Sequence, residues 1–305
     1  MPAEGIHLTA LREAMACPAL ASSVRRRLVR RDDAARFGAL VPDLAYFHHY
    51  VAEVLRYVAR VPARPSPWGA AIHDGGAVAL LGSLLTIARR ERDDDLAAIS
   101  LGLASHCAID RALHPLINAL ARAHPTGRNH DASHREVEKF QSICFHERYL
   151  GRDTMGTPAI TGYLTIQLAN RLDHRLNRLL REAWSDALGT APGERELAGF
   201  VRGYRVHARL LGTPLGKRIA PPAAKDEARP RFLLGPWGSF EALLEAAITR
   251  SLGVLEAADA VLDATTADLD RARRALAVKL PAGTIDPQGN ELDLARPVQI
   301  AALAS

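Results

Sequence analysis

The order of apolar and polar positions along the chain predicts helices almost throughout. Apolar side chains recur at intervals of three and four residues, the spacing that gathers them on one face of a helix. The segments with this pattern are 6–15, 19–29, 44–61, 77–90, 96–121, 134–149, 157–188, 196–211 and 240–278, the last with a break near 264–268. No segment alternates apolar and polar residues as a half-buried strand does, and no repeat of solenoid period occurs. The pattern therefore predicts an all-α fold.

Polar caps and helix breakers set the expected limits of these helices. Asp43 follows a proline and is expected to cap the helix over 44–61, because a carboxylate at this position accepts hydrogen bonds from free backbone N–H groups. The segments 62–76 and 212–236 contain many prolines and glycines, and we expect them to be loops. The residues from Leu280 onward have the same character and are expected to form an extended tail.

Composition and charge narrow the class of protein. The chain has 305 residues, of which 48% are hydrophobic and 24% charged, as in ordinary globular proteins. It contains no apolar run of transmembrane length and no visible signal peptide, so we expect a cytoplasmic protein without a transmembrane segment. The net charge of +5 comes with few aromatic residues for base stacking, which argues against nucleic acid as a partner. The sequence does not predict an oligomeric state.

The candidate chemistry lies in the segment 102–138. His106, Asp110 and His114 follow one another at four-residue steps, and His134 and Glu138 repeat the same step. Side chains four residues apart on a helix differ by about 40° in direction, so each set projects from one face. Ionisable side chains are costly to bury among apolar neighbours unless they are paired or ligated. Because histidine and carboxylate ligate zinc and similar ions, the two sets predict a metal site.

Several motifs resemble the zinc-dependent phospholipase C family and, more distantly, the S1/P1 nucleases. They are FGALVPDLAYF, a histidine in the segment that follows, LGLASHCAIDRALHP and SHREVE, spread over about half of the chain. The resemblance implies a multi-helix bundle that holds two or three zinc ions, or other divalent metals. It also implies a phosphoester hydrolase in which a metal-activated water attacks a phosphodiester.

The resemblance also implies the metal ligands residue by residue, and it adds three residues that spacing alone would make structural. These three are Asp43 after the proline, His73 in the following segment and His7 near the N-terminus. One metal is implied to lie among Asp43, His73, His106 and Asp110. A second is implied among His114, His134 and Glu138, and a third is implied to contact His7 and Asp110. Asp43 is further implied to act in catalysis by orienting or deprotonating the attacking water.

Two other interpretations of the same residues remain open. The adjacent His-Asp pairs at 73–74 and 130–131 are compatible with an HD-type metal phosphohydrolase. A non-catalytic helical protein with a structural metal is the other alternative. The expected partner is a phosphoester, with phospholipid as one candidate, since aromatic residues in 62–76 and 212–236 would either form an apolar surface or pack in the core. We expect a helical metal-binding domain over 1–190 and a C-terminal helical extension with its tail over 191–305, packed on that domain.

Overall fold

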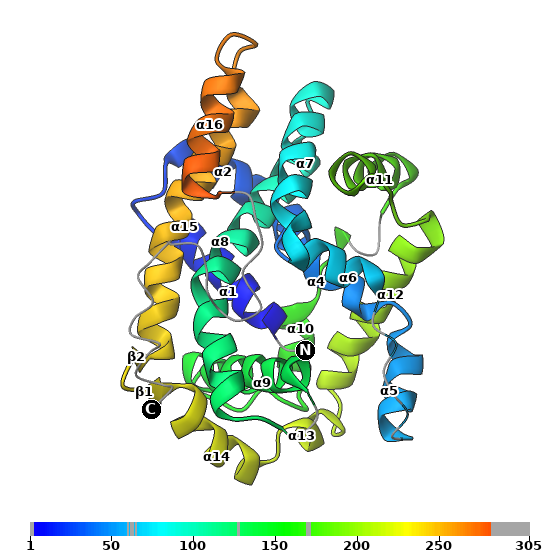
Figure 1. Ribbon diagram of the computed structural model, residues 1–305, viewed down its shortest axis with the longest axis vertical. Coiled ribbons are helices and arrows are strands. Elements are labelled where there is room, and N and C mark those ends of the chain that lie inside the picture. The colour runs from blue at the N-terminus through cyan, green and yellow to red at the C-terminus, as the bar shows by residue number, and fades with distance from the viewer. Residues whose placement is uncertain are drawn as a thin grey trace.

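The computed structural model describes residues 3–59, 61, 64, 66–126, 129–168 and 172–281. These residues form a multi-helix bundle with two very short paired strands, which confirms the all-α fold (Figure 1). The elements up to residue 149 are α1 (Ala3–Ala16), α2 (Ser22–Arg30), α3 (Asp32–Gly38), α4 (Val41–Leu44), the 3₁₀ turn η1 (Ala45–Phe47), α5 (Tyr50–Val58), α6 (Pro67–Ala71), the π-helical turn η2 (Ile72–Gly76), α7 (Ala77–Glu91), α8 (Asp94–Ala123) and α9 (His130–Tyr149). The later elements are α10 (Pro158–Leu164), α11 (His174–Leu188), α12 (Glu194–Leu211), α13 (Gly216–Ile219), α14 (Pro222–Phe232), β1 (Leu234–Gly235), β2 (Gly238–Ser239), α15 (Phe240–Asp263) and α16 (Leu269–Lys279).

Helix α8 lies at the centre of the molecule, where α1, α3, α7, α9 and α15 pack around it (Figure 1). It begins at Asp93, whose Oδ1 accepts a hydrogen bond from the backbone N–H of Leu96 at 2.8 Å. This cap satisfies one of the free N–H groups at the helix start. By length and hydropathy α8 could cross a membrane, but 89% of its most apolar window is buried inside the protein. Its apolar surface is therefore that of a core helix.

Helices α3 and α8 cross with their backbones in contact, because each presents a glycine to the other. A Cβ added to Gly38 would lie 2.0 Å from the carbonyl oxygen of Ile99, and one added to Gly102 would lie 1.9 Å from that of Ala35. No real side chain fits at such distances. The crossing therefore brings the C-terminal end of α3 directly against the middle of α8.

The predicted helix over 44–61 is wrong in its start and its continuity. Asp43 does not cap it but lies within the short helix α4. The chain then turns through η1 and breaks at His49, which has a φ of 56°, in the left-handed region that interrupts a helix. Helix α5 starts only after this break. Asp43 thus comes from a short helix of its own, which changes the direction of its side chain.

The predicted single helix over 157–188 is also wrong, because it consists of two helices. Helix α10 ends at Leu164, and α11 has its own start at Asp173. The Oδ1 atom of Asp173 accepts a hydrogen bond from the backbone N–H of Leu176 at 2.7 Å. The apolar periodicity of the two helices is similar enough to conceal the break between them.

The two predicted loops contain helices that start with proline. Pro67 begins α6 and Pro222 begins α14, positions at which the missing N–H of proline costs no hydrogen bond. Most of 62–76 therefore belongs to α6 and η2, while 212–236 forms α13, α14 and β1. Of the expected tail, residues 282–305 lie outside the part of the chain that the structure describes.

One hydrophobic core extends through both predicted domains. Helix α15 packs along α8, and the same core includes Phe232, Leu233 and Trp237 from the C-terminal part. These three side chains are buried, so they pack in the core rather than forming an apolar surface. The C-terminal helices thus pack on the N-terminal half, while the division at residue 190 stays a prediction.

Candidate metal centre

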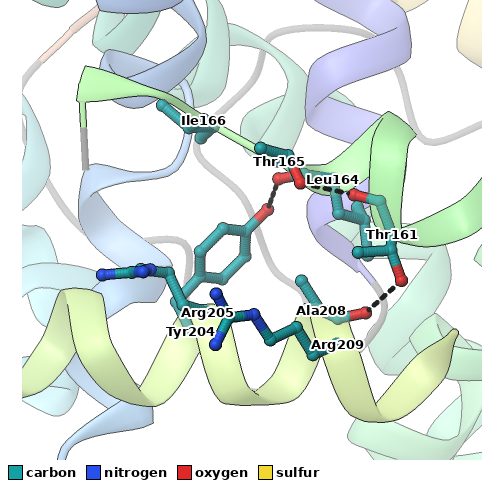
Figure 2. A pocket seen from close by; sticks show the side chains of 8 residues that line it. All are labelled: Thr161, Leu164, Thr165, Ile166, Tyr204, Arg205, Ala208 and Arg209. Carbon is teal, nitrogen blue, oxygen red and sulfur yellow. Dashed lines mark hydrogen bonds between the residues drawn. The ribbon is translucent and has the colours of Figure 1, made fainter. Parts of the chain in front are cut away.

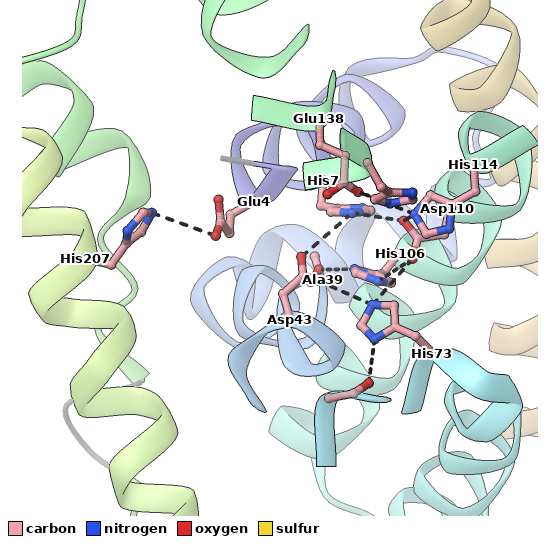
Figure 3. Close-up of polar contacts among 12 residues, drawn as sticks. Glu4, His7, Ala39, Asp43, His73, His106, Asp110, His114, Glu138 and His207 are labelled. Carbon is pink, nitrogen blue, oxygen red and sulfur yellow. Dashed lines mark hydrogen bonds and ion pairs between the residues drawn. The ribbon is translucent and has the colours of Figure 1, made fainter. Parts of the chain in front are cut away.

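The eight side chains expected as metal ligands converge on one region beside α8, although they come from five elements (Figure 3). Two groups can be distinguished. We call the first the inner cluster; it consists of His7 on α1, Asp43 on α4, His73 on η2, and His106 and Asp110 on α8. We call the second the outer cluster; it consists of His114 on α8 with His134 and Glu138 on α9.

Asp110 lies at the middle of the inner cluster. Its Oδ2 is 2.9 Å from Nε2 of His106, and its Oδ1 is 3.2 Å from Nε2 of His7. On the opposite side, Oδ1 of Asp43 is 3.5 Å from Nε2 of His73. The ligand atoms of His7, His106 and Asp110 lie within 4.8 Å of one another, as do those of Asp43, His73 and His106. The inner cluster therefore contains two groups of three donors that share His106.

The outer cluster is built by two neighbouring helices. Oε1 of Glu138 is 3.2 Å from Nε2 of His134 and 3.6 Å from Nε2 of His114. The other ring nitrogen of His134, Nδ1, donates a hydrogen bond to Oδ1 of Asn118 at 2.8 Å. Oδ1 of Asp110 is 3.5 Å from Nε2 of His114, so this carboxylate connects the two clusters.

Backbone carbonyls fix the orientation of two inner histidines. Nδ1 of His106 lies 2.8 Å from the carbonyl oxygen of Ala39, at the end of α3, and Nδ1 of His73 lies 2.9 Å from that of Gly69. A carbonyl only accepts hydrogen bonds, so each Nδ1 carries the proton and donates it. In a neutral ring the lone pair is then on Nε2, which faces the cluster. Metal-bound histidines are held in this way.

Several buried atoms of the inner cluster lack a hydrogen bond. Oδ2 of Asp43, Nδ1 of His7 and Nε2 of His106 have no hydrogen-bond partner among the described residues. Nε2 of His106 is 2.9 Å from Oδ2 of Asp110, but with the proton on Nδ1 both atoms are acceptors. Each such buried atom costs about 1–3 kcal/mol. A cation between the donors would remove this cost for Asp43 and His106.

The charges of the two clusters compensate one another. Burial raises the pKa of Asp110, but the neighbouring imidazoles of His106 and His114 outweigh it and hold the pKa well below its usual range. Burial lowers the pKa of His106, but the charge of Asp110 outweighs it, and the pKa rises to about 9. The pKa of His114 also rises to about 9, again because Asp110 outweighs burial. The carboxylates are thus ionised and attract positive charge, either as protons or as metal ions that displace them.

The donor set fits divalent transition metals. Imidazole nitrogen and carboxylate oxygen are the ligands that zinc and its neighbours use in proteins. A small recess also opens beside the clusters, and His7, Asp110, His114 and Glu138 line one side of it. The donors are therefore not closed off on all sides by the protein.

Glu4 belongs to the surroundings of the inner cluster and was missed by the sequence interpretation. Its side chain is fully buried, and neither carboxylate oxygen has a hydrogen-bond partner among the described residues. Burial, reinforced by the charge of Asp43, raises its pKa to about 8. His207 on α12 lies opposite, with its Nε2 3.9 Å from Oε1 of Glu4 (Figure 3). The available signal was the three-residue step from Glu4 to His7, which places both on one side of α1.

Comparisons with known proteins leave the family of the chain open. No family model, curated protein or solved structure matches it. The resemblance to zinc-dependent phospholipase C stays a prediction from the motifs.

Proposed function

We propose that this protein is a metal-dependent phosphoester hydrolase whose reaction takes place at the inner and outer clusters. The observation that carries the proposal is the convergence of five histidines and three carboxylates from five elements on connected groups of donors. Structural metal sites are usually closed by four protein ligands, whereas catalytic sites keep a position open. The recess beside these donors favours the catalytic alternative.

The donors have separate roles in this proposal. The inner cluster would hold one or two divalent ions, zinc by preference, and His114, His134 and Glu138 would hold another. Such ions stabilise the charge of phosphoryl oxygens and make a water molecule acidic enough to attack near neutral pH. Asp110 would orient the donors of both clusters, because its two oxygens face His106, His7 and His114.

Asp43 is the best candidate for the residue that takes the proton of the attacking water. Burial opposes ionisation, but the hydrogen bond from His73 and the nearby imidazoles of His106 and His7 outweigh it, and the pKa of Asp43 is lowered. The carboxylate is thus ionised at neutral pH. Its Oδ1 faces His73, while its Oδ2 has no hydrogen-bond partner among the described residues. One oxygen is therefore held in place and the other can accept a proton.

We propose a phosphodiester with an apolar group as the substrate, with phospholipid as one candidate. Besides the four metal-ligand candidates, the recess beside the clusters is lined by Gln141 and by four apolar residues, which are Ile6, Leu113, Ile117 and Phe240. A phosphate near the metal ligands would direct its apolar substituent toward these side chains. Burial of such a group stabilises binding by about 25 cal/mol per Å² of apolar surface.

Metal content and hydrolysis test the proposal together. We expect two or three metal ions per chain by elemental analysis, located by anomalous scattering at the zinc edge, and hydrolysis of bis(p-nitrophenyl) phosphate. Asp43→Asn should retain most of the metal but lower kcat by at least about 100-fold, because it removes the proton acceptor. Asp131→Asn is the matched control, since Asp131 is exposed at the start of α9 and belongs to neither cluster. Fewer than one bound metal per chain would contradict the proposal.

The same variants separate the alternatives. An HD-type phosphohydrolase would need the aspartate of one of its pairs as a ligand, so either Asp131→Asn or Asp74→Asn would then lose metal; the side chain of Asp74 lies outside the described part of the structure. A non-catalytic protein would bind its metals fully and hydrolyse no phosphoester. Metal that survives both Asp131→Asn and Asp74→Asn, together with hydrolysis that is lost in Asp43→Asn, supports the proposed function over both alternatives.

A further inference from the structure

A second recess lies between α10 and α12 (Figure 2). Its lining residues are Thr161, Leu164, Thr165, Ile166, Tyr204, Arg205, Ala208 and Arg209. None of them belongs to the inner or outer cluster. Nothing in the proposed hydrolysis uses this recess, so its chemistry can be considered separately.

The recess has uncompensated positive charge on one side. Arg205 and Arg209 are four residues apart on α12 and therefore lie on the same face of the helix. The side chain of Arg209 lies along α12 toward Arg205 and Tyr204 (Figure 2). Within the described part of the chain, neither guanidinium has a carboxylate at ion-pair distance. Other arginines do, such as Arg27 with Asp263 at 2.7 Å.

The remaining walls of the recess are apolar, because their polar atoms are already bonded within the protein. The hydroxyl of Tyr204 donates to the carbonyl oxygen of Leu164 at 2.7 Å, and Oγ1 of Thr165 donates to that of Thr161 at 2.7 Å. Oγ1 of Thr161 donates to the carbonyl oxygen of Ala208 at 3.1 Å. What these residues present to a ligand is therefore methyl groups and the ring of Tyr204. Two guanidinium groups beside an apolar wall complement an anion that carries an apolar chain.

We propose that this recess binds an amphiphilic oxyanion, that is, a carboxylate, sulfonate or phosphate group attached to an apolar chain. The oxyanion pairs with Arg205 and Arg209, whose planar guanidinium groups can each donate two parallel hydrogen bonds to it. The chain lies against Leu164 and Ile166. The site shares no lining residue with the inner or outer cluster and does not require the proposed hydrolase activity.

Calorimetric titration of the purified full-length protein with octane-1-sulfonate tests this site. Sulfonate is a weak metal ligand, so binding at the metal clusters contributes little to the signal. We expect the double variant Arg205→Gln/Arg209→Gln to bind at least about tenfold more weakly, because both charge-assisted contacts are lost. Arg202→Gln is the matched control: Arg202 is an exposed arginine of the same helix that does not line the recess, and its loss should change the Kd by less than about twofold.

Ligands with a shorter chain or a different head group show which part of the amphiphilic anion the recess recognises. Methanesulfonate should bind at least about tenfold more weakly than octane-1-sulfonate, because it lacks the chain that the apolar wall buries. Octanoate and octyl phosphate identify the preferred head group. Equal binding of octane-1-sulfonate by the double variant and the wild type would overturn the proposal. So would an equal loss in Arg202→Gln, or equal binding of the two sulfonates. Circular dichroism of the variants checks that each is folded, and hydrolysis of a phosphodiester is a separate readout.

Discussion

The inner and outer clusters use the same kinds of side chain but are built in different ways. The outer cluster comes from two helices that follow one another, and Glu138 faces His134 because the two are four residues apart on α9. The inner cluster gathers residues from α1, α4, η2 and α8. It is also more deeply buried, with 1% of the His106 side chain exposed against 20% of the His134 side chain. The outer cluster thus depends on local helix geometry, while the inner cluster depends on how separate helices pack.

This difference affects how each cluster responds to substitutions of residues that are not ligands. A change in the packing of α3 against α8 moves the carbonyl of Ala39 that orients His106. In the outer cluster, His134 on α9 is held by Asn118 on α8, so its orientation depends on the packing of these two helices alone. We therefore expect the inner cluster to be the more sensitive of the two to substitutions outside the ligand set.

The largest effect is expected where the clusters meet. Asp110→Asn removes the charge that faces His7, His106 and His114 and should lower the metal content of both clusters. Phosphodiester hydrolysis should fall by at least about 1000-fold, because the charge that positions the ions is lost. Elemental analysis and kcat measure the two effects. A variant that loses metal from one cluster only would show that Asp110 is not shared.

A pair of histidine variants should separate the clusters. His134→Ala should lose about one metal equivalent and leave the inner cluster loaded, since it removes a donor of the outer group alone. His106→Ala should lose all metal of the inner cluster, because both of its donor groups contain this residue. Anomalous scattering locates the ions that remain. Identical metal loss in the two variants would contradict the division into two clusters.

The close crossing of α3 and α8 can be tested by substituting residues that are not metal-ligand candidates. Gly102→Ala forces a methyl group onto the carbonyl of Ala35 and should destabilise the protein by about 3 kcal/mol, the upper range for an overpacked core. Gly82→Ala on α7 is the control, because no atom lies within 4 Å of its added Cβ. It should stabilise by up to about 1 kcal/mol. Urea unfolding measures both, and similar values for the two variants would contradict the close crossing.

Ionisation of Glu4 should make the free energy of unfolding depend on pH, to an extent that depends on the charge of the inner cluster. Its pKa is raised from 4.5 to about 8 in the folded protein, so the unfolded chain ionises first as pH rises. The wild type should therefore lose about 2–5 kcal/mol between pH 4.5 and 8 from this residue, and Glu4→Gln should not. The difference in unfolding free energy between the two proteins measures the effect. Metal ions in the inner cluster should reduce this pH-dependent difference, and chelation of the metal should restore it. A difference in unfolding free energy that does not vary with pH would contradict this account.

The sequence was sufficient to predict the all-α fold, the long helix over 96–121 and the donors on α8 and α9. These features depend on spacing within one helix, and spacing is visible in the sequence. His7, Asp43 and His73 were expected only from the resemblance, because each stands alone in its own element. Tertiary packing brings these three to the donors of α8, and no local pattern records it.

The incorrect predictions have related physical causes. The prolines in 62–76 and 212–236 predict loops, although at the first turn of α6 and α14 proline favours a helix. The break at His49 carries no glycine or proline, so periodicity alone continued the helix through it. Glu4 was missed because a buried carboxylate three residues from a histidine looks like any charged residue at a helix start.

The π-helical turn η2 makes the direction of His73 depend on chain length. This turn lies between α6 and α7 and closes with hydrogen bonds one residue longer than those of an α-helix. Deletion of one residue here would restore the α-helical register, and the side chains within the turn, His73 among them, would point in new directions. His73 would then leave the cluster although its identity is unchanged. Alignment of this chain with others must therefore preserve the residue count through η2 as well as the histidine.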